Sequence, residues 1–303
     1  MLNNIYYKQA ELLLRVLPII DRENEFALKG GTALNFFWRD FPRLSVDIDL
    51  TYLPVKERNE SLKDINDKLL NIRDGISRTI AETNITGRTT EGNLLSGLLV
   101  RNNESTIKVE VNTVIRGSVF PAERKRLCDK AEDIFELSVS VQTLSFADLY
   151  GGKICAALDR QHPRDLFDIK LLLDNEGITE NIRKAFIVYL VSHNRPINEV
   201  LNPGLQAIRP VFENEFAGMT EQETSLEDLV NVRSLLIEII RNELTADEKK
   251  FLLSFKSMNP QWELLGLNGI ENLPSVKWKL INLAKMKAKE HEMAYKKLEE
   301  YLS

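Results

Sequence analysis

Two aspartates, Asp47 and Asp49, are separated by a single residue in the segment LSVDIDLTY, residues 44–52. Apolar side chains alternate with them, and because a strand has a period of two, both carboxylates are expected on one face of a strand. Two neighbouring carboxylates repel each other, so such a pair favours a bound cation. Mg²⁺ or Mn²⁺, held by carboxylates and by the phosphates of a substrate, would supply it. The pair indicates a metal-dependent enzyme acting on nucleotides, and a solvated edge strand is the structural alternative.

A glycine pair followed by a threonine, Gly30-Gly31-Thr32, lies just before this strand. The apolar run 26–28 predicts a buried strand that stops at the glycines, and Thr32 is expected to open a helix that continues through Trp38. Backbone N–H groups and a hydroxyl at a helix N-terminus favour a triphosphate. The simpler interpretation is a glycine-rich turn with Thr32 as an N-cap, and the neighbouring aspartate pair favours the phosphate site.

A third acid, Glu110, stands on another expected strand. Residues 93–100 and 105–114 are two runs with strand character joined by a polar turn, which predicts an antiparallel hairpin. Two-metal nucleotidyl transfer generally uses a third carboxylate to complete the metal site and to help activate the attacking hydroxyl. Glu110 is therefore a candidate metal ligand, and an ion pair with Lys108 on a wet sheet face is the alternative.

A further group of charged residues lies more than a hundred residues downstream, in the segment 145–173. Helical spacing places Lys153 on a first helix, and a second helix begins near Arg164 with Asp165 and Asp168 on one face at i, i+3. The polar loop between the helices is expected to bring all four side chains close together. A helical hairpin held by salt bridges is the structural alternative.

The remaining pattern predicts the elements that position these residues. Apolar spacing at 5–20 and 55–83 predicts two helices beside the sheet, whereas the segments after residue 175 predict only helices, the last at 274–302. The sequence thus predicts an α/β (α+β) fold, in which a mixed sheet is flanked by helices and followed by an all-helical C-terminal lobe.

The length of 303 residues suggests two domains. We expect a catalytic domain at 1–142 and a helical domain at 143–303, which contributes Lys153 and Asp165 or Asp168 to the site.

Composition and charge limit the class of protein. No apolar stretch approaches the ~18 residues of a membrane span, and the start has neither the apolar core nor the flanks of a signal peptide. Cys128 and Cys155 have no metal-ligand or disulfide-framework spacing, so a reducing cytoplasm is expected. The formal net charge of −5 excludes a uniformly basic surface. A basic run at 116–130, expected as a solvated helix face, is a candidate RNA contact.

These groups of residues together make the sequence similar to a known family. It resembles the AbiE-type nucleotidyltransferase toxins (AbiEii and the related MenT proteins) of bacterial toxin–antitoxin and phage-defence systems, over roughly residues 25–175. The residues that carry the resemblance are Gly30-Gly31-Thr32, Arg43-Leu44-Ser45-Val46-Asp47-Ile48-Asp49, Lys153 and Arg164-Asp165-Leu166-Phe167-Asp168.

The resemblance implies a nucleotidyltransferase fold and a role for each matching residue. The roles are as follows: Gly30, Gly31 and Thr32 hold the triphosphate of an NTP, Asp47 and Asp49 bind the metal, Arg43 and Ser45 support this site, Lys153 and Arg164 contact the nucleotide, and Asp165 or Asp168 completes the site. Two features depart from the family pattern. Thr32 stands where serine is common, and fourteen residues separate it from Asp47, so an extended helix or loop is expected between them.

The function implied by the resemblance is that of a toxin. It would transfer a nucleoside monophosphate from an NTP to the 3′ end of tRNA, block translation, and be paired with a cognate antitoxin encoded nearby. Two alternatives stay open: a nucleotidyltransferase that modifies a small molecule, such as an antibiotic, or a protein; and a non-catalytic NTP-binding module that regulates or binds a partner.

Overall fold

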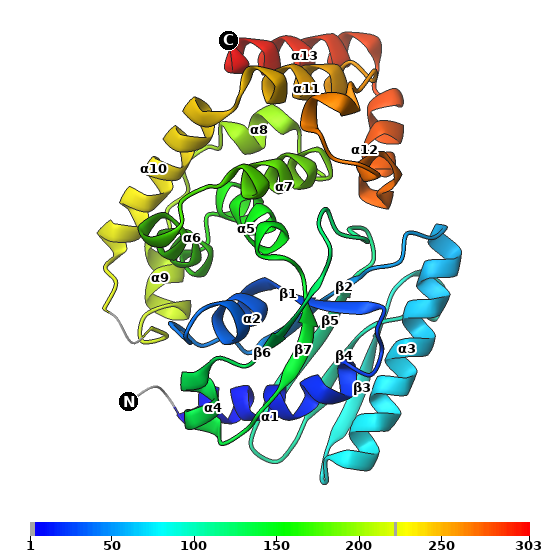
Figure 1. Cartoon of the computed structure of the whole chain (residues 1–303), viewed down its shortest axis with the longest axis vertical. Helices are drawn as coiled ribbons and strands as arrows, with labels where there is room; N and C mark the ends of the chain where they lie inside the picture. Colours follow the sequence, from blue (N-terminus) through cyan, green and yellow to red (C-terminus); the bar gives the residue numbers. More distant parts are fainter. Residues whose placement is uncertain (1–3, 221–222) are drawn as a thin grey trace. The chain divides into compact units, whose positions relative to one another are not determined.

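The computed structural model describes residues 4–220 and 223–303, and the chain divides into two compact units (Figure 1). The first, called here the sheet unit, contains the chain up to Leu149 together with Gly218–Glu223. The second, called the helical unit, contains Tyr150–Ala217 and Thr224–Ser303. A functional division at residue 142 stays a prediction.

Over the described residues, a mixed seven-stranded sheet forms the centre of the sheet unit, with strand order β3-β4-β5-β2-β1-β7-β6. Two pairs are parallel, β1 with β7 and β2 with β5, and the other neighbours are antiparallel. The strands are β1 (Phe26–Lys29), β2 (Asp47–Tyr52), β3 (Asn84–Thr89), β4 (Leu95–Arg101), β5 (Thr106–Asn112), β6 (Glu123–Arg126) and β7 (Ser140–Thr143). The predicted mixed sheet is confirmed.

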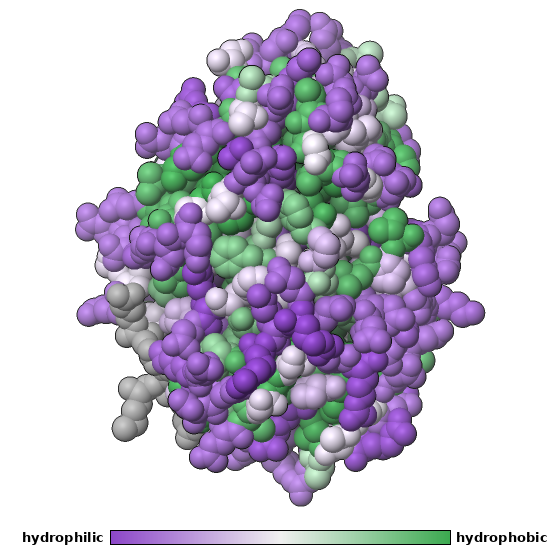
Figure 2. All heavy atoms as spheres, viewed as in Figure 1, coloured by the Kyte–Doolittle hydropathy of each residue, from purple (hydrophilic) through white to green (hydrophobic). Residues whose placement is uncertain are grey.

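Two helices pack together against the sheet, α1 (Asn4–Ile20) and α3 (Arg58–Thr79) (Figure 1). The buried positions of α3 recur every three or four residues and form one apolar stripe, which includes Leu62, Ile65, Leu69, Ile72 and Ile76. Its opposite side is covered by hydrophilic side chains (Figure 2). Leu50 of β2 and Leu17 of α1 line the same small cavity. The alternate residues of β2 therefore project from the other face of the sheet.

The segment after β1 is helical from Gly30, so the predicted helix start at Thr32 is wrong by two residues. α2 (Gly30–Ala33) continues directly into a π-helical turn, η1 (Leu34–Trp38). Gly30 has φ +72°, a conformation that glycine adopts without steric cost, and it lets the chain pass from strand to helix at once. The helix ends at Trp38 as predicted. The α2–η1 segment occupies part of the long spacing between Thr32 and Asp47.

Helices alone make up the regular structure of the helical unit over its described residues. They are α5 (Phe146–Arg160), whose first turn belongs to the sheet unit, α6 (Pro163–Asn175), α7 (Glu180–Val191), α8 (Ile197–Leu201), α9 (Arg209–Glu215), α10 (Leu226–Glu243), α11 (Ala246–Lys256), α12 (Pro274–Ala284) and α13 (Ala288–Leu302). The predicted helical lobe is thus observed. No helix among the described residues has the length and apolar character needed to cross a membrane.

Some elements differ from the sequence-based expectation. The single helix expected at 274–302 is two helices, because the chain leaves helical pairing at residues 285–287. The basic run contains strand β6 where a helix face was expected. Between β6 and β7 lies a short helix, α4 (Asp129–Phe135), which ends where Glu136 takes the left-handed conformation, with φ 52°.

Candidate active site

Five strands of the sheet unit place residues in one row across the sheet. The register pairs Arg88 of β3 with Gly97 of β4, Gly97 with Glu110 of β5, Glu110 with Asp49 of β2, and Asp49 with Lys29 of β1. Paired residues on neighbouring strands project from the same face of a sheet. The row, called here the charged row, therefore carries two adjacent carboxylates with a cationic residue on either side.

A cavity of about 230 Å³ lies over the charged row. Its lining consists of Lys29, Asp49, Arg88, Ser96, Gly97, Glu110, Val111 and Asn112. Gly97 has no side chain, and across this position Arg88 forms an ion pair with Glu110. The Arg88 and Glu110 side chains are 58% and 43% exposed, so this pair contributes no more than ~1 kcal/mol and a phosphate group can compete for it.

Asp47 and Asp49 lie on the same face of β2, with the fully buried Ile48 between them on the other face. Both aspartates are half-buried. Within the part of the chain that the structure describes, neither carboxylate has a hydrogen-bond or ion-pair partner. Two half-buried carboxylates on one face need a compensating positive charge, and this pair is open to receive one.

Gly30 lies against the second of these carboxylates. A Cβ atom at Gly30 would stand 2.6 Å from Oδ2 of Asp49, closer than van der Waals contact allows. Both the left-handed backbone and this contact exclude a larger residue. The absence of a side chain at Gly30 therefore lets the start of α2 pack closely against the carboxylate of Asp49, a candidate metal ligand on β2.

Gly31 lies against the supporting residues predicted from the resemblance. A Cβ atom there would stand 2.6 Å from Nη2 of Arg43 and 3.0 Å from Oγ of Ser45. Arg43 is 3% exposed and donates from Nη1 to the carbonyl of Leu44 at 2.8 Å. Its backbone forms a bridge to Thr220, in the stretch of chain that returns to the sheet unit. The buried Arg43 side chain thus holds the backbone of the segment that leads into β2.

Thr32 is buried, with 1% of its surface exposed. Its hydroxyl donates to the carbonyl of Asp47 at 2.5 Å and lies 2.9 Å from the hydroxyl of Ser45. In this structure the Thr32 hydroxyl therefore holds the start of β2 against α2. Its contact with a triphosphate stays a prediction.

The donor set of this site fits a hard divalent cation. Among the described residues, no three His, Cys, Asp or Glu side chains are arranged as a ready-made metal site. Mg²⁺, however, is usually bound by one or two carboxylates together with substrate phosphates and waters, and Asp47 and Asp49 provide the two carboxylates. Glu110 is engaged by Arg88, so its role as a third ligand stays a prediction.

The downstream residues form a second cluster, within the helical unit. Lys153 is 7% exposed, and its Nζ lies 3.0 Å from Oδ1 of Asp165 and 2.9 Å from Oδ2 of Asp168. The i, i+3 spacing on α6 places both carboxylates on one face toward α5, as predicted. This arrangement joins the two helices by a buried ion cluster.

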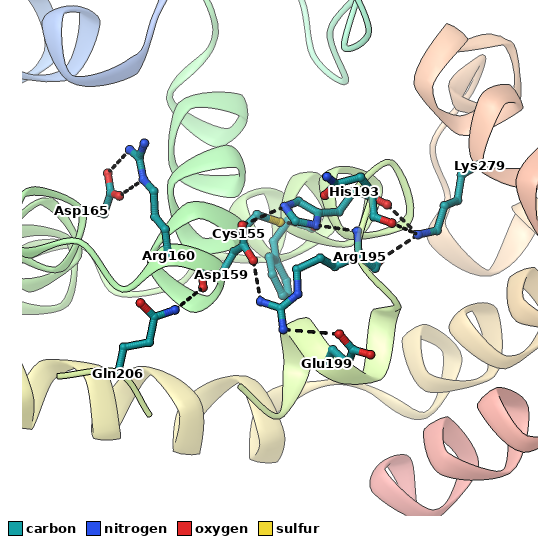
Figure 3. A network of polar contacts seen from close by, with 11 residues as sticks. Cys155, Asp159, Arg160, Asp165, His193, Arg195, Glu199, Gln206 and Lys279 are labelled. Atoms are coloured by element: carbon teal, nitrogen blue, oxygen red, sulfur yellow. Dashed lines mark hydrogen bonds and ion pairs between the residues drawn. The ribbon is translucent and has the colours of Figure 1, made fainter. Parts of the chain in front are cut away.

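Arg160, at the end of α5, binds the same aspartate from the solvent side (Figure 3). Its guanidinium donates to Oδ2 of Asp165 at 2.6 Å and to Oδ1 at 3.0 Å, a bidentate pair. Burial opposes ionisation of Asp165, but the charges of Lys153 and Arg160 outweigh it and hold the pKa of this carboxyl well below its usual range. Asp165 is therefore ionised in the folded protein.

Arg164 does not join this cluster, which corrects the expectation that the loop would bring it there. Its Nη2 lies 3.8 Å from Glu215, beside His162, whose Nε2 lies 3.1 Å from the same carboxylate. Consecutive residues of a helix point about 100° apart. Because Asp165 faces inward, Arg164 projects away from Lys153.

Sequence reasoning missed the two cationic residues of the charged row, Lys29 and Arg88. The signal for Lys29 was available, because it ends an otherwise apolar strand and the alternation opposes it to Leu28. Arg88 lies on β3, whose residues are mostly exposed, so the sequence has no apolar alternation there to reveal a strand.

Comparison with known proteins found a matching family and a similar solved structure. Residues 11–281 match the family described as "Nucleotidyl transferase AbiEii toxin, Type IV TA system". The fold is similar to that of MenT4, a nucleotidyltransferase toxin from Mycobacterium tuberculosis H37Rv, with a TM-score of 0.59 and 15% identity over 93% of this chain and 95% of that chain. No match was found among curated proteins. Because the family match spans most of the sequence, the chain belongs to the AbiEii family of nucleotidyltransferase toxins from type IV toxin–antitoxin systems.

Proposed function

We propose that this nucleotidyltransferase transfers a nucleoside monophosphate from an NTP to the 3′ end of tRNA, with Mg²⁺ held by Asp47 and Asp49. The observation that carries the proposal is the pair of carboxylates without a partner among the described residues, on the sheet face that bears the charged row. A triphosphate would bring more negative charge to that face, and a divalent cation held by Asp47 and Asp49 would offset part of it.

When bound, Mg²⁺ would neutralise the charge that develops on the triphosphate during transfer. The carboxylate oxygens of Asp47 and Asp49 are the hard ligands that such an ion prefers. Gly30 leaves the space in which Asp49 stands, and Thr32 holds the backbone of Asp47 in place. Gly30 and Thr32 are therefore positioning residues for the two proposed metal ligands, Asp49 and Asp47.

The reaction is an in-line displacement at the α-phosphorus. The acceptor hydroxyl oxygen forms a bond to this phosphorus, the bond to the bridging oxygen breaks, and pyrophosphate leaves. We assign Glu110 as the base that takes the hydroxyl proton, because it lines the cavity next to Asp49. Arg88, whose exposed ion pair with Glu110 is weak, would turn to the phosphates and free that carboxylate.

Two further parts of the sheet unit are proposed to contact the triphosphate: the backbone at Gly31 and Thr32, and Lys29 at the other end of the charged row. Backbone N–H groups at the start of α2 would contact the triphosphate, as the family resemblance implies. Lys29 lies beside Asp49 in register and lines the same cavity. Its charge would orient the phosphates against the metal ligands.

The choice of tRNA as acceptor rests on the family resemblance. The basic residues of β6 do not enter the proposal, because each already has a partner in the sheet unit. Arg124 pairs with Asp21, Arg126 pairs with Glu132, and Lys125 lies over the ring of Trp38. We also propose a cognate antitoxin encoded nearby, in keeping with the type IV family.

The cluster of Lys153, Asp165 and Asp168 is assigned first to the stability of the helical unit. Each of the three side chains is at least nine-tenths buried, and their charges balance one another together with Arg160. A contact of Lys153 or Arg164 with the nucleotide stays a prediction, and so does a catalytic role for either aspartate.

The test is a labelling experiment with the parent enzyme and Asp47→Ala. Each labelled NTP is incubated with RNA, protein and small-molecule pools in the presence of Mg²⁺. We expect label only in the RNA pool, at tRNA 3′ ends, and none with the variant. The exposed Asp67→Ala on α3 is the matched control and should label RNA as the parent does.

Other outcomes have distinct meanings. Label confined to the protein or small-molecule pool would exclude tRNA as the acceptor. Tight NTP binding without pyrophosphate release in any pool would support a binding module. An Asp47→Ala variant that still inhibits growth would remove the assignment of the metal site.

A further inference from the structure

A second cavity, of about 190 Å³, lies within the helical unit. It is bounded by the ends of α11 and α12, by α13 and by the loop that follows α7. Its lining includes Ile197, Leu283, Met286, Asn282, Lys256 and Lys279, and no acidic side chain of the described residues lines it. The cavity is therefore apolar over much of its wall and positively charged at one place.

Lys256 is the unusual member of this lining. Only 4% of its surface is exposed, and among the described residues the hydrogen-bond partner of its Nζ is the thioether sulfur of Met286 at 4.0 Å. An ammonium group has three donors, and a thioether is a weak acceptor. Burial lowers the pKa of this lysine, and no carboxylate offsets that effect. Lys256 thus brings a buried positive charge to the cavity without a counter-ion among the described residues.

Lys279 does not compensate Lys256, because it is a second cation with its own acceptors. Its Nζ donates to the carbonyls of His193 at 2.6 Å and Arg195 at 2.7 Å, and lies 3.4 Å from that of Asn194 (Figure 3). Burial, and then the charge of Lys256, lower the pKa of Lys279 to about 8. The positive charges of Lys256 and Lys279 therefore repel each other.

One carboxylate, that of Glu199, raises the pKa of Lys279 through its charge, but it is already paired with another cation. Glu199, on α8, lies 3.4 Å from Nη2 of Arg195 in the preceding loop and forms an ion pair with it (Figure 3). A buried charge without a partner is costly unless a ligand supplies the opposite charge. An anion in this cavity would face Lys256 directly and would relieve the repulsion between the lysines.

We propose that this cavity binds a small organic anion whose carboxylate or phosphate head lies at Lys256 and whose apolar body packs on Ile197, Leu283 and Met286. The cavity, at about 190 Å³, is smaller than the roughly 300–1,000 Å³ of sites for drug-sized ligands. The ligand is therefore a compact molecule with a short apolar chain. This site lies in the helical unit and does not depend on the proposed tRNA acceptor.

The experiment measures binding to the full-length chain by calorimetry with four probes: hexanoate, hexyl phosphate, neutral hexanol and inorganic phosphate. We expect at least one of the two amphipathic anions to bind, with hexanol and inorganic phosphate at least tenfold weaker. The head group that binds better identifies the ligand class. Lys256→Met should weaken anion binding by about ten- to hundredfold, the value of one charged hydrogen bond.

Two controls separate binding from folding. Lys256→Met should melt at or above the temperature of the parent, because it replaces an uncompensated buried charge with an apolar side chain of similar length. Lys250→Met removes an exposed lysine from the same helix and should bind the anions as the parent does. In the parent, the ¹⁵N or ¹³C signal of the Lys256 side chain should shift on addition of the anion.

Three results would overturn the proposal. The first is that neither hexanoate nor hexyl phosphate binds. The second is that hexanol binds as tightly as the anions, which would leave an apolar cavity only. The third is that Lys256→Met, folded by its melting curve, binds the anions with the affinity of the parent.

Discussion

The Asp49 carboxylate occupies the space that a side chain at Gly30 would need, because a Cβ atom at Gly30 would stand 2.6 Å from Oδ2 of Asp49. Gly30 also has φ +72°, in the left-handed region. The first glycine of the turn is thus fixed both by its own backbone and by the strand that carries the metal-binding candidates. The turn and the aspartate pair form one structural unit.

Gly30→Ala should impair the enzyme far more than it impairs the fold. The left-handed backbone costs alanine about 1 kcal/mol, and the methyl group must also displace the Asp49 carboxylate. Because a shift of about 1 Å at a reacting centre can cost on the order of 10²-fold in rate, nucleotide transfer should fall by that order. Steady-state transfer rates and urea unfolding measure the two effects.

Gly177→Ala is the matched control for this substitution. Gly177 has φ +70°, and nothing lies within 4 Å of a Cβ placed there. It should lose the same ~1 kcal/mol of stability and retain the transfer rate. Equal rates for the two variants would refute the link between Gly30 and Asp49.

Thr32→Val should lower stability even without nucleotide. The hydroxyl of Thr32 is buried and donates to the carbonyl of Asp47, and its loss leaves a buried acceptor unsatisfied, at a cost of about 1–3 kcal/mol. Thr32→Ser keeps the hydroxyl and should restore most of the stability and activity. A valine variant with unchanged stability but a raised KM for NTP would instead place the hydroxyl on the triphosphate.

The parts that could be predicted from the sequence are those with a local period. The alternation around Asp47 and Asp49 predicted β2 and the face of both carboxylates, because Ile48 and Leu50 alternate with them and are buried on the opposite face. The i, i+3 spacing of Asp165 and Asp168 predicted a shared face on α6. Periodicity determines which way a side chain projects within its own element, and here it was sufficient.

The parts that could not be predicted depend on register between distant strands. Nothing near Glu110 in the sequence indicates that it stands beside Asp49, since strand pairing sets that neighbour. The same holds for Arg88, which reaches Glu110 across Gly97. The hydroxyl of Thr32 donates to the carbonyl of Asp47, and nothing in the sequence near Thr32 indicates this contact. The local sequence pattern does not show which distant residue a polar side chain will bind.

Asp47→Asn should abolish transfer while leaving the metal-free fold at least as stable as the parent. The substitution removes one of two like charges on the same face of β2. Addition of Mg²⁺ and a non-hydrolysable NTP at about 100 times Kd should stabilise the parent by ~2.7 kcal/mol and the variant by much less. Thermal unfolding with and without these ligands measures the difference.

The exposed Asp67→Asn on α3 serves as the control for charge alone and should respond to Mg²⁺ and NTP as the parent does. If Asp47→Asn gains the same ligand-induced stability as the parent, Asp47 does not hold the metal. Asp49→Asn, tested in parallel, shows whether the two carboxylates contribute equally.

Lys153→Met should destabilise the protein in a pH-dependent way. It leaves Asp165 and Asp168 buried with one cation fewer, and breaking a buried ion cluster costs about 3–5 kcal/mol. In the parent, the depressed pKa of Asp165 gives stability that is complete above the ordinary aspartate pKa of about 4 and is lost as the pH falls below it. The variant has less of this stability to lose. The gap in unfolding free energy between the two proteins should therefore be largest near neutral pH and narrow in acid.

Lys170→Met, which breaks an exposed i, i+4 pair with Asp174, should cost at most ~0.5 kcal/mol. Urea unfolding of the three proteins from pH 7 to pH 3 provides the comparison. The buried cluster would be excluded as a source of stability if Lys153→Met lost no more unfolding free energy than Lys170→Met, or if its loss did not change with pH.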